Sequence, residues 1–262
     1  MSVVMGAPKV TNTPSNAWIE RYQPNPSARL RLFCFPYAGG SARIYRSWAR
    51  HLPSCVEVCP VQLPGRDRRI AEPPFSNLQL LVQAAVEALR PLFDKPFAFF
   101  GHSMGALVSF ELAHYVRAEL GLSPKHIFAS GRRAPQVSKD QSIYDLPKEE
   151  LLAELHQLKG TPPDVLDHPD LMELMLPLLR ADFALGDTYV FSVRPLLSCP
   201  ITVLGGLRDP CESRAELQAW GELTSGPFSL RMFPGDHFFL HSDELRLLEV
   251  IGRVLQQTCD SL

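Results

Sequence analysis

The stretch that decides the fold is Gly101-His102-Ser103-Met104-Gly105. An apolar run, residues 96–100, precedes it, and residues 106–113 have the apolar spacing of a helix. This order predicts a buried strand, a sharp turn and then a helix. The two glycines leave room where side chains would collide with the packed strand and helix. We therefore expect Ser103 to stand exposed at the carboxyl edge of a sheet.

A serine between two glycines at a strand-to-helix junction is typical of the nucleophile elbow of α/β-hydrolases. The pattern is short, and it recurs in hydrolases with unrelated substrates. The assignment of Ser103 as a nucleophile therefore depends on finding a base and an acid elsewhere in the chain.

Composition fits a soluble globular protein. The chain has 262 residues, of which 45% are hydrophobic and 21% charged, with a net charge of -2. These values offer no basic surface for nucleic acid and no polybasic membrane anchor. No apolar window reaches the length of a signal sequence or a membrane span, so we expect a cytoplasmic protein. Six cysteines lack metal-site spacing, so we expect no metal and reduced thiols.

Strand and helix patterns alternate along most of the chain, which predicts an α/β fold with a mostly parallel sheet covered by helices on both faces. We expect a disordered tail over residues 1–27 and a single domain over residues 28–262. Expected strands are residues 30–35, 56–61, 96–100, 126–130, 201–206 and 228–233. Expected helices are residues 44–51, 78–93, 106–113, 148–158, 171–182 and 245–257, the fifth broken at Pro177.

One long insertion, about residues 136–197, interrupts the alternation and is helical in pattern. A helical insertion beside a reactive sheet edge is interpreted as a lid. The alternative is a helical subdomain that packs only for stability.

A serine hydroxyl needs a base, and the base needs an orienting acid. In α/β-hydrolases these follow in the order serine, acid, histidine. Asp209 follows the strand 201–206, and His237 follows the strand 228–233. Both lie past carboxyl ends of strands, so we predict a triad of Ser103, Asp209 and His237.

Other histidines and acids are weaker candidates. His102 adjoins the serine on a tight turn and should point elsewhere, and His241 should lie on the surface. His126 begins a strand and belongs at the opposite edge of the sheet. The remaining acids near the site are Asp236, which would have to fold back on His237, and Asp182 and Asp187, which lie in the insertion.

The oxyanion of an acyl-transfer intermediate needs two preorganised donors. The backbone N–H of Met104, directly after the nucleophile, should supply one. The second should come from the loop after the first strand, with Tyr37 as the first candidate and Ala38 as the second.

Several segments together resemble the type II thioesterases, the free-standing editing enzymes of polyketide and nonribosomal peptide synthesis, which are related to oleoyl-carrier-protein hydrolase. They are residues 33–40, 62–66, 95–105, 159–163, 179–182 and 234–240. Asp236 stands where the family often has glycine. The match extends from about residue 30 to about residue 240.

The resemblance implies a serine enzyme that hydrolyses acyl thioesters held on the phosphopantetheine arm of acyl or peptidyl carrier proteins. It implies no cofactor of the enzyme itself, no membrane or nucleic-acid partner, and a monomer. Arg66, Arg68 and Arg69 form a candidate docking patch for an acidic carrier protein. Because Arg66 belongs to a family loop motif, structural hydrogen bonds are the favoured interpretation of its role.

Two alternatives remain open at this point. One is a general carboxylesterase or lipase that acts on oxygen esters. The other is a binding protein that keeps the hydrolase fold without catalysis, although such a protein has no need of all three triad residues.

Overall fold

The computed structural model describes residues 17–138, 142–158, 160 and 163–262. Residues 1–16 of the expected tail and most of the 159–163 motif lie outside the described residues. Six strands form one fully parallel sheet in the order β2-β1-β3-β4-β5-β6. They are β1 (Leu30–Phe35), β2 (Val56–Pro60), β3 (Phe97–His102), β4 (Ile127–Ser130), β5 (Ile201–Gly206) and β6 (Phe228–Phe233). The expected fold class is confirmed.

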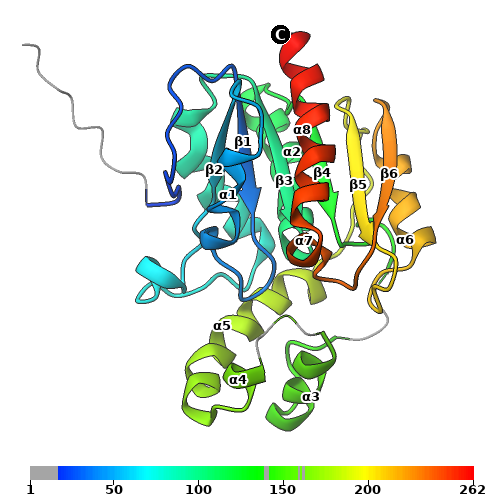
Figure 1. Ribbon diagram of the computed structural model, residues 1–262. Helices are drawn as coiled ribbons and strands as arrows, with labels where there is room; N and C mark the ends of the chain where they lie inside the picture. Colours follow the sequence, from blue (N-terminus) through cyan, green and yellow to red (C-terminus); the bar gives the residue numbers. More distant parts are fainter. Residues whose placement is uncertain (1–16, 139–141, 159, 161–162) are drawn as a thin grey trace, which may run out of the picture.

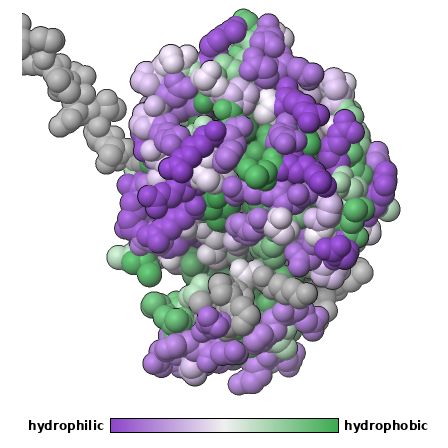
Figure 2. All heavy atoms as spheres, viewed as in Figure 1, coloured by the Kyte–Doolittle hydropathy of each residue, from purple (hydrophilic) through white to green (hydrophobic). Residues whose placement is uncertain are grey.

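Alternate residues of each strand point to opposite faces of the sheet, and helices cover both faces, so both are buried. Phe33 and Phe35 of β1 pack with α1 (Leu78–Leu89) and α2 (Met104–Leu120), whereas Leu30 and Leu32 pack with α8 (Glu244–Asp260) on the other face. Figure 1 shows α8 lying across the front of the sheet. The face seen in Figure 2 carries mostly hydrophilic residues, with hydrophobic ones scattered among them.

Three helices between β4 and β5 form a separate layer at one end of the sheet (Figure 1). They are α3 (Lys148–Leu158), α4 (Pro163–Leu166) and α5 (Pro169–Asp187). They share a small apolar core of their own, made by Leu151, Leu155, Leu166, Met172, Leu176 and Leu179. The insertion therefore packs as a unit, in addition to any role over the sheet edge.

The expected break at Pro177 is wrong, since α5 continues through it. A proline inside a helix costs one backbone hydrogen bond and a steric clash. Here Met172 and Leu176 before it and Leu179 after it all bury in the same apolar core, which holds the two halves in one helix.

Residues 17–27, which were expected to belong to a disordered tail, are among the residues that the structure describes. Ile19 is buried and forms an antiparallel bridge with Val61, and the Glu20 N–H donates to the Pro60 carbonyl. These contacts attach this segment beside the edge strand β2, because an apolar side chain here can join the core. The expected helix over residues 44–51 is also wrong. It is two 3-10 turns, Ala42–Tyr45 and Trp48–Arg50, whose aromatic residues are buried.

The remaining short helices are α6 (Arg214–Gln218) and α7 (Phe239–Ser242), together with the 3-10 turns Asp67–Arg69, Arg90–Leu92 and Ala219–Leu223. The sequence patterns did not predict α6, which begins in a capping box made by Ser213 and Glu216. None of the six cysteines is in a disulfide, as expected. Among the described helices, none combines the length and the apolar character that crossing a bilayer requires.

Candidate active site

Ser103 sits on a strained turn between β3 and α2. Its backbone has φ 52° and ψ -114°, a conformation that non-glycine residues rarely adopt. The neighbouring glycines explain how the turn fits. A Cβ on Gly101 would lie 2.0 Å from the carbonyl oxygen of Gly105, and a Cβ on Gly105 would lie 2.2 Å from that of Phe35. The turn is thus possible only because both positions lack side chains.

Asp209 and His237 form a buried pair beside this turn. The Asp209 Oδ2 atom lies 2.8 Å from His237 Nδ1, and the two side chains are 0% and 7% exposed. The backbone N–H of Cys211 donates to the other carboxylate oxygen, Oδ1, at 2.8 Å. A carboxylate can only accept, so Nδ1 carries the proton and Nε2 offers its lone pair.

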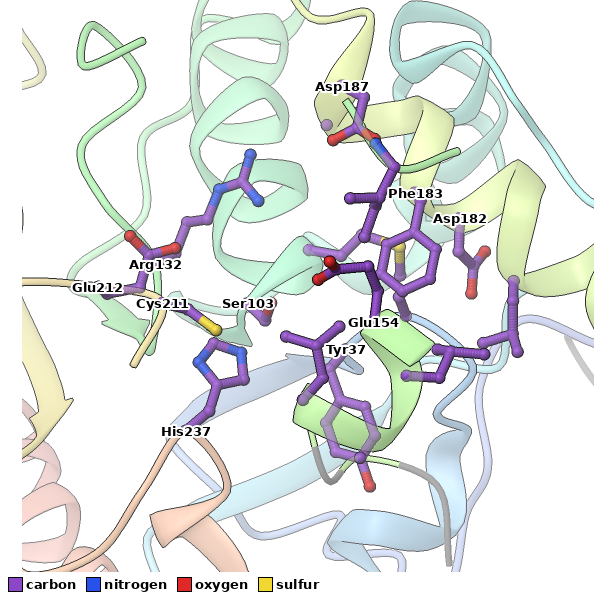
Figure 3. A pocket seen from close by; sticks show the side chains of 18 of the residues that line it. Tyr37, Ser103, Arg132, Glu154, Asp182, Phe183, Asp187, Cys211, Glu212 and His237 are labelled. Carbon is purple, nitrogen blue, oxygen red and sulfur yellow. The ribbon is translucent and has the colours of Figure 1, made fainter. Parts of the chain in front are cut away.

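Ser103 and His237 line one cavity together with Tyr37, Ala38 and Met104. Figure 3 shows Ser103 and the His237 imidazole converging on this cavity from different loops. The structure therefore brings together all five residues that the sequence nominated, as well as the alternative Ala38.

The other histidines have separate partners. His102 is fully buried, and its Nδ1 lies 2.8 Å from the Ser130 hydroxyl oxygen. Burial, and then the nearby His237 and His241, lower the pKa of His102 far below its ordinary value, so its ring stays neutral. His241 is bonded to the Tyr37 hydroxyl at 2.9 Å. The His102 ring packs beside that of His237, with the ring centroids 5.2 Å apart.

Asp182 is an important residue of the site that sequence reasoning set aside. It accepts two hydrogen bonds from Arg66, at 2.9 and 2.7 Å, and one from the Gly39 N–H at 2.7 Å. Arg66 also donates to the Gly40 carbonyl at 2.9 Å. Helix α5 is thereby tied to the loop that follows β1. The family-like motifs around Arg66 and Asp182 were the only sequence signal of this link.

The basic cluster has structural partners. Arg69 is buried and bonds the Gln62 carbonyl and the Glu72 carboxylate, and Arg68 bonds the Ala17 and Ile19 carbonyls. The expected structural role of Arg66 is confirmed by its bonds to Asp182 and Gly40. The guanidinium groups of Arg66 and Arg69 are buried in these contacts, whereas the Arg68 side chain is 41% exposed.

The cavity has a volume of about 330 Å³ and is partly roofed by α3 and α5. Its apolar wall is made by Ile143, Leu155, Leu158, Leu179 and Phe183. Charged groups also line it. Burial lowers the pKa of Arg132, and burial raises the pKa of Glu212 although nearby arginines oppose that shift. Residues of the insertion therefore form part of the wall of the cavity that Ser103 and His237 line.

The model of the thioesterase domain family matches residues 30–257. Linear gramicidin dehydrogenase LgrE of Brevibacillus parabrevis is 44% identical over 250 residues, covering 94% of this chain and 95% of that protein. Thioesterase PikA5 of Streptomyces venezuelae is 39% identical over 231 residues, covering 88% and 82%. The structure of the type II thioesterase BorB from the borrelidin biosynthetic cluster is 39% identical, with a TM-score of 0.83 over 92% of this chain and 99% of BorB.

The name of the first relative includes the word dehydrogenase, and that activity is not transferred to this protein. In this chain no described strand is followed by the G-x-G-x-x-G loop of a dinucleotide site, and β3 leads into the serine turn instead. A family match over most of the chain, on a sheet whose edge carries this serine turn, shows that the protein belongs to the thioesterase domain family and is a hydrolase of thioesters.

Proposed function

We propose that this enzyme hydrolyses acyl thioesters from the phosphopantetheine arms of acyl or peptidyl carrier proteins. In this role it removes stalled or aberrant acyl groups during polyketide or nonribosomal peptide synthesis. The observation that carries the proposal is the buried Asp209–His237 pair beside the strained Ser103, within one lidded cavity. The pathway assignment follows the relatives, which include a protein named for gramicidin S biosynthesis and structures named for borrelidin and yersiniabactin pathways.

In the proposed mechanism, Ser103 Oγ attacks the thioester carbonyl carbon while His237 Nε2 takes the hydroxyl proton. The backbone N–H groups of Met104 and Tyr37 donate to the oxyanion, with Ala38 as the alternative to Tyr37. The C–S bond then breaks, and the imidazolium returns its proton to the pantetheine sulfur. Asp209 holds the imidazole in the required tautomer throughout.

Water completes the cycle. His237 removes a proton from a water molecule, which attacks the acyl–Ser103 ester and releases the carboxylic acid. The proton returns to Ser103 Oγ, so the enzyme ends in its starting state. A thiolate is a good leaving group, so selectivity would lie in which acyl chain fits the cavity under α3 and α5.

This mechanism requires no cofactor bound to the enzyme. We place the enzyme in the cytoplasm with its synthase, acting as a monomer on a carrier protein that docks at the cavity mouth.

The experiment that tests this function compares three substrates with the same acyl group. They are an acyl-loaded carrier protein, the acyl-pantetheine thioester, and the matched oxygen ester. The proposal predicts the highest kcat/KM for the carrier-bound thioester and the lowest for the oxygen ester. A preference for the oxygen ester would support a general esterase and contradict the proposal.

The binding-protein alternative has its own test. A fluorophosphonate should label the wild-type enzyme and fail to label Ser103→Ala. Absence of labelling in a folded wild-type protein would favour a non-catalytic receptor.

A further inference from the structure

A thiol lies beside the Asp209–His237 pair. Cys211 follows Asp209 by two residues, and its backbone N–H bonds the Asp209 carboxylate at 2.8 Å. One donor atom each from Asp209, Cys211 and His237 lie within 4.8 Å of one another. Figure 3 shows the Cys211 sulfur next to the His237 ring, facing the cavity. The catalytic mechanism proposed above uses the carboxylate and the imidazole but has no task for this thiol.

We propose that Asp209, Cys211 and His237 form a binding site for a thiophilic divalent cation, with Zn²⁺ or Cd²⁺ as the fitting ions, and that the bound ion inhibits the enzyme. Thiolate, imidazole and carboxylate are the three ligand types that Zn²⁺ takes in proteins, and a soft sulfur ligand disfavours Mg²⁺ and Ca²⁺. The inference rests on the positions of three side chains and holds whatever acyl group the enzyme accepts.

The spacing is close to what an ion needs. With a Zn–S bond of about 2.3 Å and Zn–N and Zn–O bonds of about 2.0 Å, tetrahedral ligands stand roughly 3.5 Å apart. The three donor atoms therefore have to approach one another by at most about 1.3 Å to reach coordinating distance. Cys211 and His237 both lie in loops, after β5 and after β6, where side chains can adjust by this amount. The fourth position would face the cavity.

Binding needs no oxidant or reductant. The Cys211 thiol releases its proton to solvent as the S–metal bond forms, and a ring nitrogen of His237 donates its lone pair to the ion. Because Nδ1 faces Asp209, it is the ring nitrogen that can share an ion with that carboxylate. As the ion binds, the ring proton moves from Nδ1 to Nε2 by way of solvent, and the Asp209 hydrogen bond that fixes the tautomer is replaced. Nε2 then has no lone pair for the Ser103 proton, so occupancy and activity exclude each other.

Cys211 can be distinguished from the other half-buried thiol of the chain. Cys55 lies near the start of β2, its sulfur bonded to the Gln256 side-chain oxygen at 3.8 Å, and it does not line the cavity. Cys34, Cys59, Cys199 and Cys259 are buried. Cys55→Ser is therefore a matched control for Cys211→Ser, because each removes one partly accessible sulfur.

The test has a binding arm and an activity arm. In the binding arm, Cd²⁺ is titrated into the full-length Ser103→Ala protein, which cannot turn over substrate, and thiolate-to-Cd²⁺ charge-transfer absorption is recorded. We expect one equivalent of Cd²⁺ to bind. The absorption should be lost when Ser103→Ala is combined with Cys211→Ser in one protein, and it should be kept when Ser103→Ala is combined with Cys55→Ser. In the activity arm, Zn²⁺ and Cd²⁺ should inhibit the wild type reversibly, with recovery on chelation, and Mg²⁺ should not inhibit.

We expect a large difference in Cd²⁺ affinity between the wild type and Cys211→Ser, since removing a direct ligand weakens metal affinity by at least about tenfold. The inhibition constant for Cd²⁺ should rise by that factor in Cys211→Ser, and in Cys211→Ala if the serine variant folds poorly, while Cys55→Ser should match the wild type. The inference is overturned if Cys211→Ser and wild type are equally sensitive, if the Cd²⁺ absorption persists without Cys211, or if neither ion inhibits the wild type.

Discussion

Arg66, in the loop after β2, holds Asp182 of helix α5 through two hydrogen bonds of 2.9 and 2.7 Å. The pair is almost completely buried, with side-chain exposures of 5% and 1%. Asp182 also accepts the Gly39 N–H, and Arg66 also donates to the Gly40 carbonyl. One ion pair thus connects helix α5 of the insertion to the loop that we propose supplies the second oxyanion donor.

Breaking this pair should destabilise the protein strongly. Asp182→Ala leaves the Arg66 guanidinium buried without its carboxylate, which typically costs about 3–5 kcal/mol of unfolding free energy. The displaced Gly39 loop should also lower kcat more than it raises KM. Urea unfolding and steady-state kinetics measure the two effects. Glu72→Gln, which weakens the more exposed pair with Arg69, is the control and should cost no more than about 1 kcal/mol. Equal losses in both variants would contradict this role for Asp182.

The serine turn should not tolerate a side chain at Gly105. The added Cβ of Gly105→Ala would meet the Phe35 carbonyl oxygen at 2.2 Å and the Pro36 carbonyl oxygen at 2.8 Å, so β1 and α2 would have to separate. We expect a severe loss of soluble protein or of thermal stability. Gly252→Ala is the control, because its Cβ has no contact closer than 3.6 Å and the residue lies inside α8. That variant should be neutral or more stable by up to about 1 kcal/mol. A normal melting temperature for Gly105→Ala would refute the steric argument.

Asp209 should act through the tautomer of His237. Asp209→Asn would present an amide that can hold the opposite tautomer, so kcat should fall roughly 10⁴-fold with little change in KM. Asp236→Asn provides the comparison, since its amide oxygen can still accept the Phe238 N–H that Asp236 now accepts at 3.0 Å. That variant should lose less than about tenfold. If Asp236→Asn were the more damaging change, the acid of the triad would be misassigned.

Stability should fall as the pH drops below about 6.5. Burial lowers the pKa of His126 from 6.5 to about 4, and burial, with Arg194 and Arg117 nearby, lowers that of His114 to about 3. Between these pKa values and 6.5 the unfolded chain binds protons that the folded protein does not. Each histidine therefore lowers the free energy of unfolding by about 1.4 kcal/mol for every unit that the pH falls. Urea unfolding at several pH values measures the slope, and His126→Gln should reduce it above pH 4. An unchanged slope in that variant would contradict the assignment.

The sheet and the triad could be predicted from the sequence because each depends on short patterns of neighbouring residues. A buried strand needs a run of apolar residues, a serine turn needs Gly101 and Gly105, and loops after parallel strands meet at one edge, which brought Asp209 and His237 to Ser103. The strand bounds agree with the structure to within a residue or two.

The remaining features depend on contacts between distant segments. Nothing local to Asp182 says that Arg66 will be its partner, and nothing local to Ile19 says that β2 has an edge to cover. Pro177 predicted a helix break by propensity, and burial in the apolar core of the insertion overrode that preference. Cys211 lay in a loop whose path no periodic pattern could fix, so its closeness to His237 became visible only in the structure.

The most direct test of the central claim is intact-protein and peptide mass spectrometry after rapid mixing with an acyl-loaded carrier protein. The account predicts a transient acyl adduct on the peptide that contains Ser103, and release of the acid. It also predicts that Ser103→Ala forms no adduct and releases acid at least about 10³-fold more slowly. An adduct on another residue, or acid release by Ser103→Ala within tenfold of the wild-type rate, would contradict Ser103 as the nucleophile of this thioesterase.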